Sequence, residues 1–261
     1  MSVDLDLDAL LRVALHAAAQ GGAIVRAAFG AASDVRAKGP GDWVSAADTA
    51  SERAVRAALH AGAADLAVFG EEEGGDRAAV GWLVDPLDGT ANFLHGFPVV
   101  GVSIALVAEH RPVVAVVHAP LLGNTYWATA GGGAWCDDEP LSVSTRDAEA
   151  AICATGFPFR AKRERLGEYF PVFERALTTF EDLRRAGSAS LDLAWTAAGV
   201  FDGYFEQALG PWDVAAGALL VREAGGVVTD WAGDPDAWLG TGDILAAPRA
   251  IHEQLLDIVA R

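Results

Sequence analysis

The chain has 261 residues, 52% of them hydrophobic, so it can bury the core of one large domain or of two modest ones. Its formal net charge is −17, and so acidic a surface repels nucleic acids and anionic membranes. No apolar run reaches the roughly 18 residues of a membrane helix, and the acidic N-terminal segment lacks a secretion signal, so we expect a cytoplasmic protein that binds neither membrane nor nucleic acid.

From the N-terminus, the sequence predicts two helices followed by short strands. Apolar residues recur at helical spacing over Leu7–Phe29, with a weak point at Gly21-Gly22. The Gly- and Pro-rich segment 34–44 predicts a loop or hairpin, and Ser45 with Asp48 fits a capping box that opens a second helix. Strands are expected in the apolar runs that follow, at 66–69, 81–84, 99–107, 112–120 and 125–130, the last three as an antiparallel meander.

The chain changes character near residue 150. Beyond the polar segment 142–151, short strands alternate with helices, one over about 164–179 and one that Asp213 opens and Gly225-Gly226 closes. The sequence therefore predicts a mixed α and β fold, with an N-terminal α+β half at 1–149 and a C-terminal α/β half at 150–261.

Four carboxylates stand where a strand ends or a helix begins. They are Glu71 in FGEEEGG, Asp85 and Asp88 in WLVDPLDGT, and Asp213 in PWDVAAG. Mg²⁺ prefers oxygen ligands and keeps some waters that a substrate phosphate can replace. In the turn between the two aspartates, proline fixes the backbone, so both carboxylates and the carbonyl of Leu87 can face one ion.

A phosphate seat is expected directly after this turn. Gly89 and Thr90 offer free backbone N–H groups where a helix begins, which is a favourable place for an anion. Each residue also has an ordinary structural explanation: turn formation for the two aspartates, helix capping for Asp213, and a solvated acidic loop for Glu71. Taken together, the four carboxylates with a Gly-Thr in place favour a metal site.

The motifs as they stand are specific to one family. WLVDPLDGTANFLHGFP, preceded by FGEEEG and followed by PWDVAAGALLVREAGG, resembles the inositol monophosphatase family of Mg²⁺-dependent, lithium-sensitive sugar-phosphate phosphatases. The resemblance extends from KGPGDWVSAAD to the C-terminal AGG segment. It implies a layered α/β/α/β/α sandwich that forms a homodimer.

The resemblance also implies a role for each matching position. Two or three Mg²⁺ ions would be held by Glu71, Asp85, the Leu87 carbonyl, Asp88 and Asp213, and Asp85 would bridge two of them. The catalytic residues implied are Glu71 together with Thr90 and Asp48, the pair that orients the attacking water. For Asp48, the sequence does not separate this role from helix capping.

Further positions would meet the substrate. Gly89 and Thr90 would bind phosphate oxygens through backbone amides, while Glu206 and Ala189 would line the pocket for the alcohol. Lys38 and Asp42 would lie on a mobile loop that helps to order a further metal or the substrate. The neighbouring Arg184 and Arg185 could face a substrate or a partner subunit, or form a solvated basic pair.

These expectations lead to one preferred function and several alternatives. We expect Mg²⁺-dependent hydrolysis of a phosphate monoester, with inositol 1-phosphate as the preferred substrate, by direct attack of a metal-activated water. The alternatives are a related phosphatase acting on histidinol phosphate, fructose 1,6-bisphosphate or an adenosine bisphosphate, and a non-catalytic partner protein of the same fold.

Overall fold

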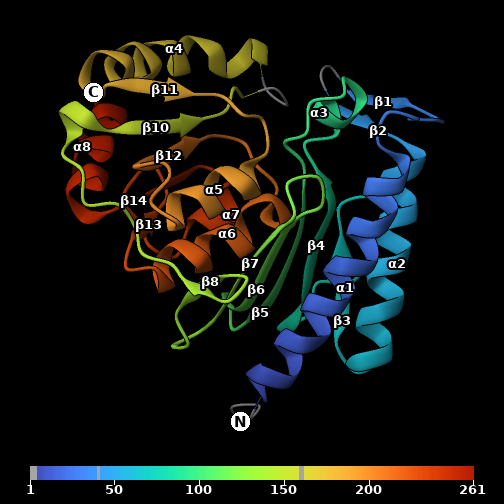
Figure 1. Ribbon diagram of the computed structural model, residues 1–261. Coiled ribbons are helices and arrows are strands. Elements are labelled where there is room, and N and C mark those ends of the chain that lie inside the picture. Colours follow the sequence, from blue (N-terminus) through green and yellow to red (C-terminus); the bar gives the residue numbers. More distant parts are fainter. Residues whose placement is uncertain (1–4, 40–41, 159–161) are drawn as a thin grey trace.

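The computed structural model describes residues 5–39, 42–158 and 162–261, which fold into five alternating layers of helices and sheets (Figure 1). The first layer consists of α1 (Leu7–Ala28) and α2 (Ala46–Gly62), which pack against each other and against one face of a large sheet. Beside them, β1 (Arg36–Gly39) and β2 (Asp42–Val44) form the hairpin expected in the Gly- and Pro-rich segment.

The second layer is a seven-stranded sheet in the order β3-β4-β5-β6-β7-β8-β9. Its strands are β3 (Ala67–Gly70), β4 (Val80–Asp88), β5 (Gly101–Ala108), β6 (Arg111–Ala119), β7 (Asn124–Thr129), β8 (Ala134–Cys136) and β9 (Glu139–Pro140). The expected meander is confirmed, but β3 pairs with β4 in parallel, so the sheet is not wholly antiparallel. Helices cover both faces, which is why its central strands are continuous apolar runs rather than alternating ones.

The C-terminal half supplies the other three layers. A five-stranded sheet has the order β11-β10-β12-β14-β13, formed by β10 (Ile152–Thr155), β11 (Asp182–Arg184), β12 (Gly203–Glu206), β13 (Val227–Thr229) and β14 (Ile244–Ala247). Between the two sheets lie α5 (Ala189–Ala197) and α6 (Pro211–Glu223), and on the outer face lie α4 (Lys162–Thr179) and α8 (Arg249–Ala260). The described residues also form three short helices: α3 (Thr90–Leu94), η1 (Ala148–Ala150) and α7 (Trp238–Thr241).

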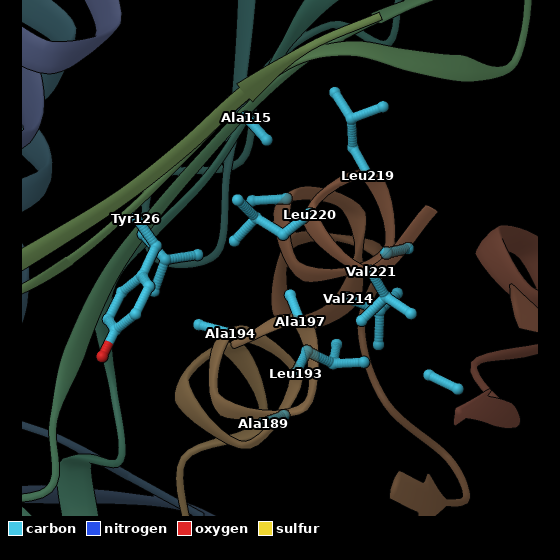
Figure 2. Packing of buried hydrophobic residues seen from close by; sticks show 14 of the residues in the cluster. Ala115, Tyr126, Ala189, Leu193, Ala194, Ala197, Val214, Leu219, Leu220 and Val221 are labelled. Carbon is cyan, nitrogen blue, oxygen red and sulfur yellow. The ribbon is translucent and has the colours of Figure 1, made fainter. Parts of the chain in front are cut away.

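The middle layer forms the largest hydrophobic core. Both α5 and α6 are buried almost all round, because each has a sheet on either side. In Figure 2, Ala194 of α5 and Leu220 of α6 lie on the side of the helix pair that faces the sheet residues Ala115 and Tyr126. Small residues let the two helices approach closely: a Cβ added at Gly217 would lie 2.3 Å from the Cβ of Leu193.

Two local expectations differ from the structure. Helix α1 runs through Gly21 and Gly22 without a break, and these glycines are places of close approach rather than of weakness. A Cβ at Gly22 would lie 2.3 Å from the ring of His118. Strand β4 also continues to Asp88 instead of ending at Val84, because its pairing with β5 resumes after an irregularity.

The five-layer architecture predicted from the resemblance is confirmed. Strands β3 to β9, all before residue 149, build the seven-stranded sheet, and the strands after it build the five-stranded sheet, while α5 and α6 pack on both. The division into two domains at this point stays a prediction. Within the described ranges, no helix combines the length and apolar character that a membrane crossing requires.

The close packing of α6 on α5 can be tested with two glycine substitutions. Gly217→Ala should lower the free energy of unfolding by about 1–2 kcal/mol, since overpacking costs about 1–3 kcal/mol and the gain in helix propensity returns at most about 1. Gly167→Ala, in α4 with no atom within 4 Å of the added Cβ, should raise it by about 0.5–1 kcal/mol. Urea denaturation measures both, and equal effects in the two variants would contradict this packing.

Candidate functional site

Three carboxylates from distant parts of the chain meet at one end of the seven-stranded sheet. Glu71, Asp85 and Asp213 each offer one oxygen, and these oxygens lie within 4.8 Å of one another. Glu71 follows β3 and its amide bonds to the carbonyl of Val84, so the parallel pairing of β3 and β4 brings it beside Asp85. Asp213 belongs to the first turn of α6, which Ser103 of β5 holds by donating from Oγ to the Trp212 carbonyl at 3.0 Å.

A β-bulge places Asp85 and Asp88 next to the same cluster. Asp85 pairs with Ser103 and Asp88 with Gly101, so β4 has one more residue than β5 over this interval. In a regular strand, residues three apart point to opposite faces, and the extra residue removes that opposition. Pro86 lies in the bulge, where its missing N–H breaks no ladder bond.

Asp88 lies outside the group of three and is held by the start of α5. Its Oδ2 accepts hydrogen bonds from Ser188 Oγ at 2.7 Å, from Ser190 N at 2.7 Å and from Ser190 Oγ at 2.5 Å. None of these bonds uses Oδ1. The carboxylate is therefore fixed in orientation and keeps one oxygen for a further partner.

The charges in this cluster oppose one another. Burial raises the pKa of Asp85 well above its usual value, and the nearby charges of Glu71, Asp88 and Asp213 raise it further. Burial, followed by the charge of Asp213, raises the pKa of Asp88 to about 6 although Ser190 and Ser188 donate to it. Such a set of hard oxygen donors fits a divalent cation such as Mg²⁺, which would relieve this repulsion.

Asp48 serves two partners with its two oxygens. Oδ2 accepts from the backbone N of Ser45 at 2.8 Å and from its Oγ at 2.6 Å, which completes the capping box of α2. Oδ1 accepts from Thr90 Oγ1 at 2.9 Å, and the same hydroxyl lies 3.1 Å from the Leu87 carbonyl oxygen. Capping and contact with Thr90 therefore coexist.

The turn before α3 requires glycine. Gly89 has a φ of +93°, and a Cβ there would lie 2.9 Å from the Val99 carbonyl oxygen. Gly89 is the N-cap residue of α3 and has no side chain that could accept a hydrogen bond. The backbone amides at the start of the helix, from Thr90 on, therefore have no capping side chain. This is the arrangement expected for a phosphate seat.

Lys38 reaches the cluster from the β1–β2 hairpin. Its Nζ lies 3.2 Å from Glu71 Oε1 and 2.5 Å from Glu72 Oε1. Burial alone lowers the pKa of Lys38, but the charges and hydrogen bonds of Glu71 and Glu72 outweigh this and raise it overall. Asp42 begins β2, and its side chain lies outside the described part of the chain.

The residues expected to meet the alcohol include another buried carboxylate, Glu206. Glu206 ends β12 and is 5% exposed, and its Oε2 accepts from Tyr204 Oη at 2.6 Å. A Cβ at Gly156 would lie 2.0 Å from the Glu206 carboxyl group, so a side chain at that position would displace this group. Burial raises the pKa of Glu206 to about 7, against the lowering effects of Tyr204 and of the Arg185 charge.

The other predicted positions separate into distinct environments. Ala189 is the first residue of α5 and lies between the two serines that hold Asp88. Arg184 forms a surface ion pair with Asp182, whereas Arg185 lies over the ring of Phe157 and acts electrostatically on Glu206. The two arginines therefore do not form one basic pair.

Sequence reasoning missed several residues that position the site. Glu52 is fully buried and accepts from the amides of Glu72 at 2.8 Å and Glu73 at 3.0 Å, so it shapes the loop that carries Glu71. Its signal was an acidic residue on the apolar face of α2, four residues after Asp48. Ser188 and Ser190 had no comparable signal, since their partner Asp88 is about a hundred residues away along the chain.

A sequence model of the inositol monophosphatase family matches residues 6–261. The chain belongs to the inositol monophosphatase family. Members of this family are metal-dependent phosphatases, and Glu71, Asp85 and Asp213 form a group that could hold a metal ion.

Individual relatives carry several names. The chain is 40% identical over 256 residues to "Nus factor SuhB" of Escherichia coli, covering 95% of each. It is 34% identical over 261 residues to "Fructose-1,6-bisphosphatase/inositol-1-monophosphatase" of Aquifex aeolicus, covering 98% of this chain and 97% of that protein. The crystal structure of extragenic suppressor protein suhB from Bartonella henselae superposes with a TM-score of 0.92 at 35% identity, covering 97% and 99% of the two chains.

The electrostatics of the site predict an effect of pH on stability. Asp88 and Glu206 have folded-state pKa values of about 6 and about 7, above the roughly 4 of an unfolded chain. Their stabilising contribution is therefore complete below about pH 4 and lost as the pH rises through 6 to 7. Without divalent cations, the free energy of unfolding, measured by urea denaturation, should fall as the pH rises from about 4 to about 8. This fall should be smaller in Asp88→Asn than in wild type, by roughly 2–3 kcal/mol.

Adding MgCl₂ at pH 8 provides the complementary measurement. Wild type should regain stability, because a ligand that binds the folded state stabilises it by mass action, and Asp88→Asn should regain less. Asp88→Asn keeps an oxygen that can accept from Ser190, so the comparison isolates charge. An identical pH profile and identical Mg²⁺ response in both proteins would contradict this reading of the cluster.

Proposed function

We propose that the protein is a Mg²⁺-dependent phosphatase that hydrolyses a phosphate monoester, with inositol 1-phosphate as its preferred substrate. The observation that carries this proposal is the convergence of Glu71, Asp85 and Asp213 within 4.8 Å of one another, beside the oriented carboxylate of Asp88. Their oxygens, with Asp88 Oδ1 and the Leu87 carbonyl, would hold two or three Mg²⁺ ions. Bound Mg²⁺ supplies a nucleophilic water at neutral pH and neutralises charge on the phosphate.

Thr90 and Asp48 would orient the attacking water. The Thr90 hydroxyl donates to Asp48 Oδ1, which leaves the oxygen of Thr90 free to accept a proton from that water. As the water attacks phosphorus, Thr90 would pass its own proton to Asp48. Burial raises the pKa of Asp48 despite the hydrogen bonds from Ser45, which favours proton acceptance at this oxygen.

The phosphate and the alcohol would bind on separate elements. The amides of Gly89 and Thr90 would hold phosphate oxygens in a position fixed by the positive φ of Gly89. Glu206 and Ala189 would meet the alcohol, with Glu206 accepting hydrogen bonds from ring hydroxyls. Lys38 would help to order a further metal or the substrate from the hairpin, together with Asp42. Lithium sensitivity, a cytoplasmic location and a homodimer remain predictions.

Two alternatives draw support from the names of relatives. The Aquifex aeolicus relative carries both fructose-1,6-bisphosphatase and inositol-1-monophosphatase in its name, which makes a sugar bisphosphate the second candidate substrate. The Escherichia coli relative is named as a Nus factor, which keeps open a role as a partner protein of the same fold. Histidinol phosphate and an adenosine bisphosphate complete the candidate substrates.

A panel of phosphate esters, assayed with and without Mg²⁺, tests the substrate. The panel contains inositol 1-phosphate, fructose 1,6-bisphosphate, histidinol phosphate and adenosine 3′,5′-bisphosphate. We expect the highest kcat/KM for inositol 1-phosphate and no turnover when Mg²⁺ is chelated. A clear preference for another ester would replace the substrate, while Mg²⁺-independent turnover or none at all would overturn the proposed activity.

Two matched substitutions test the machinery. Asp85→Asn should lower kcat/KM at least about 100-fold, because the cation contributes several kcal/mol to stabilising the transition state. The amide oxygen of the new side chain can still accept the hydrogen bond that the Leu87 N–H donates to Asp85. Thr90→Val should lower kcat about 100-fold or more, and Thr90→Ser, which keeps the hydroxyl, should stay within about tenfold of wild type. Circular dichroism and thermal melting check that each variant folds. Near-full activity in Asp85→Asn would refute the assignment.

A further inference from the structure

A cavity of about 310 Å³ lies at the opposite end of α6 from the acidic cluster. Asp213 belongs to the first turn of this helix and Arg222 to its last turn, so about 14 Å of helix axis separates the two. The volume is at the lower end of the range for small-molecule sites. The cavity is lined by Arg111 of β6, Arg222 of α6, Val227 and Val228 of β13, and the loop residues Pro235 and Asp236. None of these residues belongs to the candidate metal or phosphate site.

The guanidinium group of Arg222 is held in one orientation at this cavity. Its Nη2 donates to the carbonyl of Val228 at 3.3 Å and to that of Pro235, and its central carbon lies 5.3 Å from the centroid of the Trp238 ring. Within the described ranges, its Nε and Nη1 donate to no protein acceptor. A guanidinium group has five N–H donors, so Arg222 keeps donors for a further partner in a position that the fold has already fixed.

The positive charge of Arg222 lacks a close counter-charge. Both of its acceptors are neutral carbonyls, and none of the ion pairs among the described residues includes it. Burial lowers the pKa of Arg222, while the charge of Asp236 raises it and that of Arg111 lowers it again. A partly buried cation costs free energy unless an anion pairs with it, and an anion in the cavity would form that pair.

Arg111 places a second guanidinium group at the same cavity. Its Nη2 lies 3.2 Å from Asp236 Oδ1, in an ion pair whose side chains are 67% and 58% exposed. Exposed pairs of this kind contribute little to stability, so an anionic ligand can take the place of Asp236 beside Arg111. Guanidinium groups bind phosphate oxygens through two parallel N–H donors, and two such groups suit a ligand group with two negative charges.

We propose that this cavity binds a small phosphorylated organic molecule, at a site separate from the acidic cluster. Arg111 and Arg222 would donate to the phosphate, and the organic part would lie against Val227, Val228 and Pro235. A cavity of about 310 Å³ far exceeds the roughly 30 Å³ that one water takes up in the liquid, so it has room for more than the phosphate group. Because the chain carries a net charge of −17, long-range attraction would not bring an anion here, and the two arginines must hold it by direct contact.

A nuclear magnetic resonance titration with phenyl phosphate tests the site directly. The protein is kept in metal-free buffer without sulfate or inorganic phosphate, so that the acidic cluster repels the ligand. The amide signals of Gly226, Val227 and Val228 should shift and saturate, with a Kd of about 1 mM or below. Phenol, which has the same ring without the phosphate, should cause no shift, and inorganic phosphate should bind at least about fivefold more weakly.

Charge-changing variants with a matched control separate this site from general electrostatics. Arg111→Gln should raise the Kd about tenfold, the size of a hydrogen bond to a charged group. Arg261→Gln removes the same charge from an ion pair with Asp257 of almost equal exposure, 66% and 59%. Because Arg261 does not line the cavity, this control should leave the Kd within about twofold of wild type. Asp236→Asn should lower the Kd about threefold, because it frees Arg111 and removes the negative charge that competes with the ligand.

The proposal is overturned if wild type shows no saturable shift at residues 226–228 up to about 10 mM phenyl phosphate, or if phenol or inorganic phosphate binds equally well. It is also overturned if Arg111→Gln and Arg261→Gln have the same Kd, or if Asp236→Asn binds more weakly than wild type. Thermal melting checks that each variant folds. The titration uses neither metal nor turnover: a protein that hydrolyses inositol 1-phosphate without these shifts loses this inference alone, and one that binds here but hydrolyses no ester loses only the proposed function.

Discussion

The arrangement of the site depends on two buried helices whose first turns face the bulged end of β4. The first turn of α5 donates three hydrogen bonds to Asp88, and the first turn of α6 carries Asp213. Helix N-termini carry partial positive charge, which makes them suitable neighbours for carboxylates. Both helices can lie between two sheets because most of their residues are buried and apolar, and many of these are alanine. Packing in the middle layer therefore determines where the acidic groups meet.

The carboxylates that would bind the metal are also groups whose mutual repulsion destabilises the folded chain. Burial and nearby carboxylates raise the pKa values of Asp85 and Asp88, and the folded chain bears that repulsion until a counter-ion arrives. The surrounding structure compensates with bonds that fix orientation: Ser45 and Thr90 on Asp48, Lys38 on Glu71, Tyr204 on Glu206. Each of these three carboxylates is thus held in place by at least one donor.

The sequence allowed the family, the mixed fold and most of the candidate site to be predicted, because the motifs are local. Asp85, Asp88 and Thr90 lie within one short segment, and the structure brings Glu71 and Asp213 to it. The layer order came from the resemblance, since periodicity says which face of an element is apolar but not which element covers it. Ser188, Ser190 and Glu52 were missed for a related reason: each bonds to a partner that only the tertiary structure brings near. The roles of Glu71, Thr90 and Asp48 in catalysis stay predictions.

The bulge in β4 has a consequence for how this segment can evolve. Because successive side chains in a strand alternate between faces, Asp85 and Asp88 can serve one site only while β4 holds one residue more than β5 across that interval. Loss or gain of a single codon there would turn one aspartate toward the opposite side of the sheet while leaving its neighbours chemically intact. The number of residues between the two aspartates is therefore as strongly constrained as their identity, whereas surface turns elsewhere on the chain can vary in length.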